Sequence, residues 1–278
     1  MKFKLNPFVD EDDKSKKEAF DKKWNWTKYL LGFYTIGFEN KNNKKIESKF
    51  LKVFCFLAII FFIISMIGSV YLISSGVYTK LNTPKNLTIS GVGLVIPSIS
   101  QDDFKDIRED VNKTKSGIIP SKNRRDLVFI PFFLLIPIIC IIGTIHEFGH
   151  YIACRRFGVK VDEYGLGALA ICSIPIIPLG YVKPNEKELE KASKYSYLSI
   201  ISSGIFMNVI GVIIFMIFYI FFRNTFFDYL FTFNLAVLLL NVLPLGPLDG
   251  GLFVKKLNVK LWYVASIISL ILIVLAVM

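Results

Sequence analysis

Residues 141–153 read IIGTIHEFGHYIA, and this stretch decides how the rest of the chain is interpreted. It holds both histidines of the chain, His146 and His150, with Glu147 between them in an otherwise apolar run. On a helix, residues four apart lie on one face, so the two imidazoles can hold one metal ion. Glu147 projects beside that ion, which suits a base acting on water. Two histidines merely hydrogen-bonded in a core are the weaker alternative, because polar groups in an apolar span are costly without a function.

Apolar residues fall into long runs along the chain, and charged residues are confined between the runs. They make up 53% of 278 residues, above the level of about 45–50% in soluble domains. This distribution predicts an all-α integral membrane protein with about five transmembrane helices plus a re-entrant β-hairpin-like segment. The net charge of +11 lies on lysines beside apolar runs. Anionic lipid headgroups explain it, and we expect no nucleic-acid partner. The charged start of the chain does not resemble a signal peptide.

Five of the apolar runs are predicted to cross the membrane. They are residues 53–74, 127–154, 197–222, 226–248 and 261–278. A further apolar stretch, YGLGALAICSIPIIPLGYV at residues 164–182, is long enough to cross, but its glycines and prolines argue against a plain helix. We predict a re-entrant hairpin or loop there, shielded by protein or lining a cavity, because irregular backbone is not tolerated in contact with lipid.

The ends of the apolar runs divide the chain into five parts. They are a cytosolic N-terminal segment at 1–49, a first span at 50–75, an extracytosolic loop at 76–126, a catalytic membrane core at 127–252, and a cytosolic turn with the last span at 253–278. Within the first part, WNWTKYLLGFYTIGF at residues 24–38 is too short to span. An interfacial helix and a cytosolic segment without special role are its two interpretations. Within the loop, ISGVGLVIPSIS at residues 89–100 favours short strands.

Lysine and arginine set the predicted orientation in a multi-pass protein of the cell membrane. The strongly basic N-terminal segment is expected to stay in the cytosol, and five spans then place the C-terminus outside. This scheme places three basic stretches on the cytosolic side: Arg155 with Arg156, the segment KPNEKELEKASK at 183–194, and Lys255 with Lys256. The active site is therefore expected toward the cytosol. The loop at 76–126 is also basic, but long loops follow the rule poorly.

A catalytic zinc site needs a third protein ligand besides the two histidines. Cys154 lies eight residues after His146, about 12 Å along a helix axis, so one straight helix cannot easily supply all three ligands. Cys172, in the predicted hairpin, is an alternative. Asp249 in NVLPLGPLDGG at 241–251 is the better candidate, because binding a metal would offset the cost of burying its carboxylate. A plain Asp–Gly turn is the competing interpretation.

Three motifs give the chain a specific resemblance. The motifs are HEFGH followed by YIACRRFGV, then SGIFMN, then NVLPLGPLDGG. In this order, and over residues 127–252, the chain resembles the site-2 protease family of intramembrane zinc metalloproteases. PIIPLGYVKPNEKELEKAS is similar to the segment after the catalytic helix in archaeal and bacterial members. Without an obvious PDZ-sized insertion or C-terminal regulatory domain, the chain resembles a minimal member. The resemblance implies one Zn²⁺ per chain, held by His146, His150 and Asp249, with Glu147 as general base.

Two asparagines in apolar spans are further site candidates. Asn208 lies four residues after Gly204, and Asn241 lies three before Pro244. Helix–helix packing through a small residue and a hydrogen bond is one interpretation of such buried amides. The resemblance places both near the active site, where they would hold the substrate backbone or the oxyanion. Pro244 lacks an amide donor, and we expect it to distort its helix just before Asp249.

The resemblance implies hydrolysis of peptide bonds within or near the transmembrane helices of other membrane proteins. The lipid bilayer and a transmembrane-helix substrate are then the partners. Such a helix must unwind, because its carbonyls are held in its own hydrogen bonds, and the hairpin at 164–182 could pair with the unwound strand. The alternatives are another membrane H-E-x-x-H peptidase, against which NVLPLGPLDGG argues, and a non-catalytic membrane metal-binding protein, which would need ligands strung along several spans.

Overall fold

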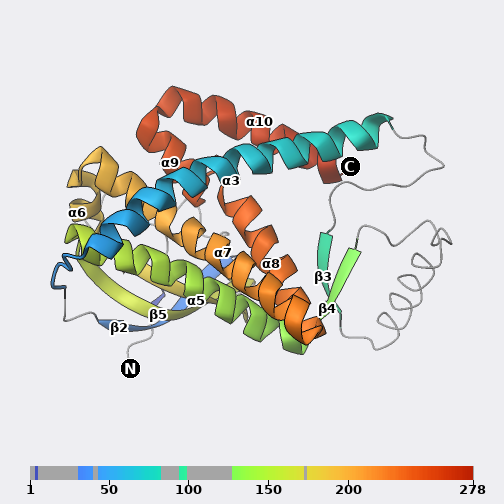
Figure 1. The fold of residues 1–278 in the computed structure, drawn as a ribbon, viewed down its shortest axis with the longest axis horizontal. Coiled ribbons are helices and arrows are strands. Elements are labelled where there is room, and N and C mark those ends of the chain that lie inside the picture. Colours follow the sequence, from blue (N-terminus) through green and yellow to red (C-terminus); the bar gives the residue numbers. More distant parts are fainter. Residues whose placement is uncertain are drawn as a thin grey trace. The chain divides into compact units, whose positions relative to one another are not determined.

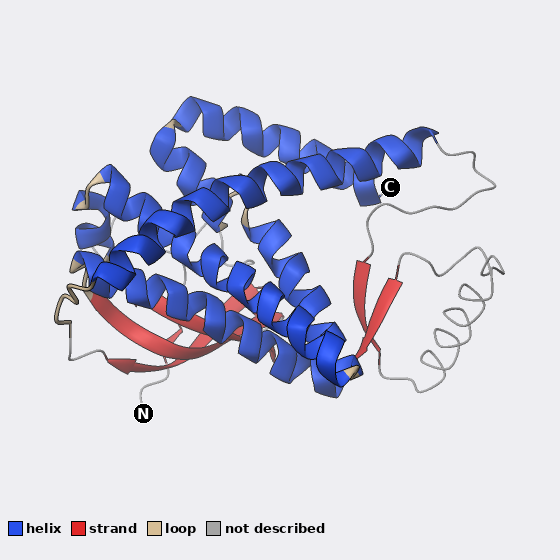
Figure 2. Cartoon of the chain, viewed as in Figure 1, coloured by secondary structure: helices blue, strands red, loops and turns tan. Residues whose placement is uncertain are grey.

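The computed structural model describes residues 4–5, 31–39, 43–82, 94–98, 127–171 and 174–277, and Figure 1 traces their elements in chain order. Helices make up most of these residues, and the strands gather in two sheets (Figure 2). The chain forms two compact units. The first comprises Met1–Phe56 and Ile139–Met207, and the second comprises Leu57–Ile138 and Asn208–Met278.

Three of the described helices are long and apolar enough to cross a membrane. They are α3 (Lys49–Asn82), α5 (Phe132–Phe157) and α7 (Lys194–Phe222). They correspond to the predicted spans at 53–74, 127–154 and 197–222, and they support a membrane location. The other two predicted spans correspond to shorter apolar helices, α8 (Thr225–Asn241) and α10 (Val259–Val277). The number of crossings therefore stays a prediction.

The segment before Asp249 differs from the prediction. The span expected at 226–248 ends at Asn241, and a turn leads to the short helix α9, Asp249–Leu257. Pro244 therefore does not distort a helix, because it lies beyond the helix end. Pro244, Pro247 and Gly246, which has a φ of +39°, break the helical pattern, since proline lacks the amide donor and glycine tolerates positive φ. Asp249 becomes the first residue of a new helix.

The predicted hairpin at 164–182 forms a β-hairpin. Strand β5 (Val161–Ile171) pairs antiparallel with β6 (Ile174–Pro184), with Tyr164 opposite Val182. A short helix, α6 (Glu186–Lys191), follows β6. The hairpin belongs to a four-stranded sheet in the order β1-β2-β5-β6, where β1 is Lys4–Leu5 and β2 is Leu31–Glu39. The prediction of an all-α protein is therefore right about the predominance of helices and wrong in leaving out this larger sheet.

Strand β2 corrects one interpretation of the N-terminal segment. An interfacial helix was one interpretation of residues 24–38, yet residues 31–39 are extended and pair with β5 from Leu31 opposite Ile171 to Glu39 opposite Glu163. Their sequence LGFYTIGFE explains the outcome, because aromatic and β-branched residues favour strands and two glycines disfavour a helix. Residues 24–30 lie outside the described part of the chain.

A second, two-stranded sheet lies in the other unit. Strand β3 (Leu94–Ser98) pairs in parallel with β4 (Leu127–Pro131). The short-strand interpretation of residues 89–100 is confirmed over β3. Strand β4 takes up the start of the span that we predicted at 127–154, so helix α5 begins only at Phe132.

Helices α7 and α8 pack through one buried amide. Asn234 of α8 is 1% exposed, and its Nδ2 donates to the backbone carbonyl of Asn208 on α7 at 2.9 Å. A Cβ on Gly211 would lie 2.7 Å from that Nδ2, so the amide fits only beside a glycine. Ser69 of α3 is fully buried and donates to the carbonyl of Leu239 on α8 at 2.8 Å. Asn234 and Ser69 thus each bond to a backbone carbonyl of a neighbouring helix.

Gly211→Ala should destabilise the protein by about 1–3 kcal/mol, because the added methyl overlaps the Asn234 amide in a packed seam. Thermal unfolding in a mild detergent measures the effect. Gly68→Ala is the matched control, since a Cβ at Gly68 in α3 meets no atom within 4 Å. That variant should unfold at or above the parent temperature, because alanine favours helix over glycine. Equal loss in both variants would contradict this account of the seam.

Candidate metal centre

The two histidines of the HEFGH motif meet on one face of α5. His146 and His150 are 8% and 9% exposed, and their Nε2 atoms lie 3.1 Å apart. Their rings are close to perpendicular, with centroids 4.8 Å apart. The spacing of four residues brings one imidazole above the other, as predicted from the sequence. Two imidazole nitrogens that could bind a metal therefore converge on one face of a helix that is long and apolar enough to span a membrane.

The second ring nitrogen of His150 is fixed by the neighbouring helix. Its Nδ1 lies 2.8 Å from the backbone carbonyl of Ile200 on α7, and both groups are buried. A carbonyl only accepts hydrogen bonds, so Nδ1 is the ring nitrogen that carries the proton. Nε2 then presents its lone pair toward His146. This hydrogen bond sets the tautomer and the ring orientation that a metal-binding histidine needs.

Two glycines make room for the histidines where α5 and α7 meet. A Cβ on Gly204 of α7 would lie 2.4 Å from Nε2 of His150 and 2.8 Å from Cε1 of His146. A Cβ on Gly149 of α5 would lie 2.2 Å from the carbonyl oxygen of Ser203. No side chain fits at either position. The glycine inside HEFGH thus allows the close approach, and Gly204 leaves the space that the imidazoles fill.

Glu147 turns toward the hairpin instead of joining the two imidazole nitrogens. Its Oε2 accepts a hydrogen bond from the backbone N–H of Val182 on β6 at 2.9 Å. Close by, α5 and β6 touch through two glycines, because a Cβ on Gly143 would lie 3.3 Å from the backbone nitrogen of Gly180. The carboxylate is therefore held next to the histidines by a strand.

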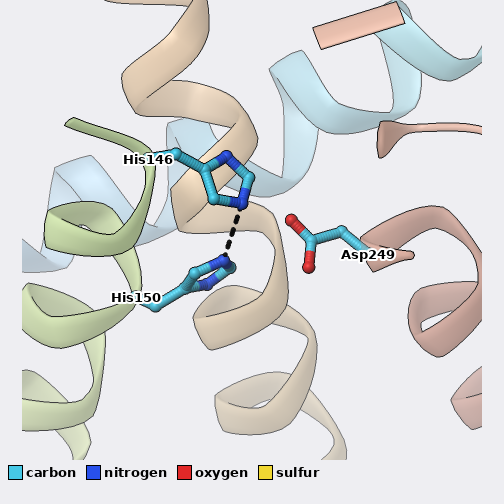
Figure 3. A group of neighbouring side chains, drawn as sticks. All are labelled: His146, His150 and Asp249. Carbon is cyan, nitrogen blue, oxygen red and sulfur yellow. Dashed lines mark hydrogen bonds between the residues drawn. The ribbon is translucent and has the colours of Figure 1, made fainter. Parts of the chain in front are cut away.

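Asp249 is the third donor of the group. Ligand atoms of His146, His150 and Asp249 all lie within 4.8 Å of one another, and Figure 3 shows the carboxylate turned toward the two imidazoles. The two histidines are buried and Asp249 is partly exposed. Among the described residues, Cys154 is buried on α5 but is not part of this group. Cys172, the other alternative third ligand, lies outside the described residues.

The donor set fits a zinc ion. Zinc prefers imidazole nitrogen, carboxylate oxygen and thiolate, and catalytic sites use three protein ligands with one open position. When two nitrogens bind the same zinc ion at about 2.0–2.1 Å in tetrahedral geometry, they lie about 3.3 Å from each other. The observed 3.1 Å between the Nε2 atoms of His146 and His150 is close to that value. Two imidazoles and one carboxylate could hold a metal as such a three-ligand set.

The two candidate asparagines lie in different surroundings. Asn208 is fully buried on α7, and its backbone carbonyl accepts the Asn234 amide. Asn241 is the last residue of α8 and is partly exposed. Their roles at the site stay predictions.

The sequence analysis did not single out Asn234, and it did not show that Gly149 lies against Ser203. An asparagine in the middle of an apolar run was the available signal for Asn234, but the partner of Gly149 needed the structure.

The comparison with protein families falls on the same part of the chain. The model of peptidase family M50 matches residues 133–225, which include HEFGH and Asn208 and end before Asn241 and Asp249. No curated protein and no solved structure matches the chain. The family match confirms the resemblance to the site-2 protease family that the motifs indicated, and it supports a metallopeptidase.

Gly204→Ala should weaken metal binding at least about tenfold, because the new methyl would overlap the His150 imidazole and displace Nε2. Zinc content after dialysis against a graded chelator measures the effect. Gly211→Ala is the control, since it also crowds a buried position on α7 but touches Asn234 and neither histidine. It should retain the zinc affinity of the parent at a temperature where both variants are folded. Unchanged zinc affinity in Gly204→Ala would refute the packing argument.

Proposed function

We propose that this chain, which matches peptidase family M50 over residues 133–225, is a zinc-dependent endopeptidase of the site-2 protease type. It would hydrolyse peptide bonds within or near the transmembrane helices of other membrane proteins. One observation carries the proposal: two buried imidazoles whose Nε2 atoms lie 3.1 Å apart, with a glutamate beside them, on a helix apolar enough to span a membrane. Ionisable groups within a membrane-spanning helix are typical of functional sites.

His146, His150 and Asp249 are the proposed ligands of one zinc ion per chain. The imidazoles are presented by α5, and the carboxylate is presented by the first turn of α9. Zinc bound there would supply a Lewis acid that activates water and polarises the scissile carbonyl. The hydrogen bond from His150 Nδ1 to the Ile200 carbonyl supports this role, because it keeps the other ring nitrogen unprotonated.

Glu147 is the proposed general base. It would accept the proton of the attacking water on one carboxylate oxygen and then deliver a proton to the leaving amine. Its position next to His146 and its partly buried contact with β6 support this role, since a base must be held within reach of the water that it deprotonates. Asn208 and Asn241 are proposed to hold the substrate backbone or the oxyanion, where amide donors stabilise developing charge.

The sheet offers a way to hold an unwound substrate. A transmembrane helix must open locally to expose its scissile carbonyl. Strand β6 lies at one end of the order β1-β2-β5-β6, so a substrate strand could add by β-augmentation to the part of its outer edge that α5 does not contact. The Val182 N–H on that edge is taken by Glu147, so an added strand would end next to the proposed base.

We propose that the N-terminus is cytosolic, the C-terminus is extracytosolic and the site lies toward the cytosol. Basic residues in the last turns of α5 and α9 support this orientation; they are Arg155, Arg156, Lys255 and Lys256. The pairing of β2 with β5 supports one part of this scheme, namely that the N-terminal segment and the hairpin lie on the same side. Strand β2 precedes α3 and its partner β5 follows α5, so two crossings return the chain to the same side of the membrane.

Glu147→Gln should keep zinc and lose proteolysis. Glutamine keeps the size of the side chain but cannot accept the proton, and general-base catalysis is commonly worth about 10²–10⁴-fold. Asp249→Asn should lose zinc and activity together, because it weakens a ligand. Both variants are purified in detergent and reconstituted with a transmembrane substrate. Zinc content and cleavage are then measured in the same samples.

Two results would contradict these assignments. Full proteolysis by Glu147→Gln would remove Glu147 as the base. Parent-like zinc affinity in Asp249→Asn would mean that the third ligand lies elsewhere, and Cys172 would be the next residue to substitute. A parent protein that binds zinc but cleaves no transmembrane substrate would favour the non-catalytic metal-binding alternative.

The proposed orientation predicts opposite accessibility for two inserted tags. A tag near residue 100, in the loop at 76–126, should react with a membrane-impermeant reagent applied from outside intact cells. A tag near residue 188, in α6, should react only after the membrane is opened. The reverse pattern would move the site to the other side of the membrane.

A further inference from the structure

Helix α5 and strand β6 meet at two points with matched spacing. The first is the contact between Gly143 and Gly180, and the second is the hydrogen bond from Val182 N to Glu147 Oε2 at 2.9 Å. Gly143 and Glu147 are four residues apart on a helix, about 6 Å along its axis. Gly180 and Val182 are two residues apart on a strand, about 6.6 Å. The two elements therefore make both contacts at once when they run side by side.

The Val182 N–H points away from the rest of the sheet. In an antiparallel strand, successive backbone N–H groups point to opposite edges. Because the N–H of Val182 reaches Glu147 on α5, those of Tyr181 and Lys183 point toward β5. Strand β6 is the end strand of the sheet order, so the edge that carries the Val182 N–H is the outer one. The sheet loses no ladder hydrogen bond by holding Glu147.

We propose that the backbone N–H of Val182 is a positioning group for Glu147. The Gly143–Gly180 contact sets the separation of α5 and β6, and with it the distance between this N–H and the carboxylate. The inference rests on the proposed function, in which Glu147 is the base. A glutamate side chain has three rotatable bonds, and a base misplaced by about 1 Å can lose roughly 10²-fold in rate. Anchoring Oε2 on the strand restricts this freedom before substrate arrives. The hairpin thereby acts on the base as well as on an added substrate strand.

The first test removes one backbone N–H without changing a side chain. Replacing Val182 by its α-hydroxy acid analogue turns the amide into an ester and deletes the donor to Glu147. We expect kcat to fall by roughly 10- to 100-fold, with KM and zinc content unchanged, because the base is displaced and the binding surface is retained. The same ester at Lys183 is the control. It deletes an N–H that faces β5, and kcat should stay within about twofold of the parent. Equal kcat in the parent and the Val182 ester would overturn the proposal.

The second test measures the hydrogen bond without proteolysis. Amide exchange at Val182 should become roughly 10- to 100-fold faster in Glu147→Ala, because a hydrogen bond to a charged acceptor is lost. Glu188→Ala is the matched control, since Glu188 Oε2 accepts from the backbone N–H of Lys160 at 2.7 Å near the base of the same hairpin. It should speed exchange at Lys160 and leave Val182 unchanged. Unchanged exchange at Val182 in Glu147→Ala would show that the bond does not form.

The two tests separate this inference from the proposed function. A parent chain that cleaves no substrate overturns the proposed function and the catalytic meaning of the bond, even if exchange at Val182 depends on Glu147. A parent chain that cleaves substrate, but whose Val182 ester is as fast, keeps the proposed function and removes Val182 as a positioning group.

Discussion

Helix α7 passes α5 so closely that neither helix tolerates a side chain at the contact, and the candidate metal centre depends on this approach. Gly149 faces the Ser203 carbonyl, and Gly204 faces both imidazoles. A wider separation would carry the Ile200 carbonyl away from His150 Nδ1 and leave that ring without its fixed tautomer. In lipid, close backbone approach through small residues is a main source of helix association, so the same contact stabilises the fold and orients the ligands.

Three polar side chains in these apolar helices bond to backbone carbonyls, as the interior of a membrane requires. His150 bonds to the Ile200 carbonyl, Asn234 to the Asn208 carbonyl and Ser69 to the Leu239 carbonyl. Glu147 reverses the pattern, because its carboxylate accepts from a backbone N–H. Few backbone N–H groups inside a protein are left over from the hydrogen bonds of helices and sheets. The outer edge of β6 supplies one, the N–H of Val182. The hairpin therefore gives the site a backbone donor that the middle of a helix could not offer.

Local patterns predicted the parts of the structure that depend on near neighbours. The spacing of His146 and His150 follows from helix geometry, and the glycines and prolines of residues 164–182 indicated a break from helix that proved to be a β-hairpin. Contacts between distant segments were not predictable in the same way. The residues of LGFYTIGFE favour a strand, but nothing in this sequence indicates that β5 is its partner. Asp249 was expected at the end of a long span, yet Pro244, Gly246 and Pro247 end the helix earlier and let a second one begin at the carboxylate.

The pairing of β2 with β5 also imposes an order on biosynthesis. Glu39 lies opposite Glu163 and Leu31 lies opposite Ile171, so the partners are separated by 124 to 140 residues of chain. During translation, β2 leaves the ribosome long before β5 exists, and α3 and α5 are made in between. An early strand rich in aromatic residues is prone to pair with the wrong edge while it waits. The sheet beside the site can therefore close only after α5 has been made, which makes its assembly a late step in the maturation of the protein.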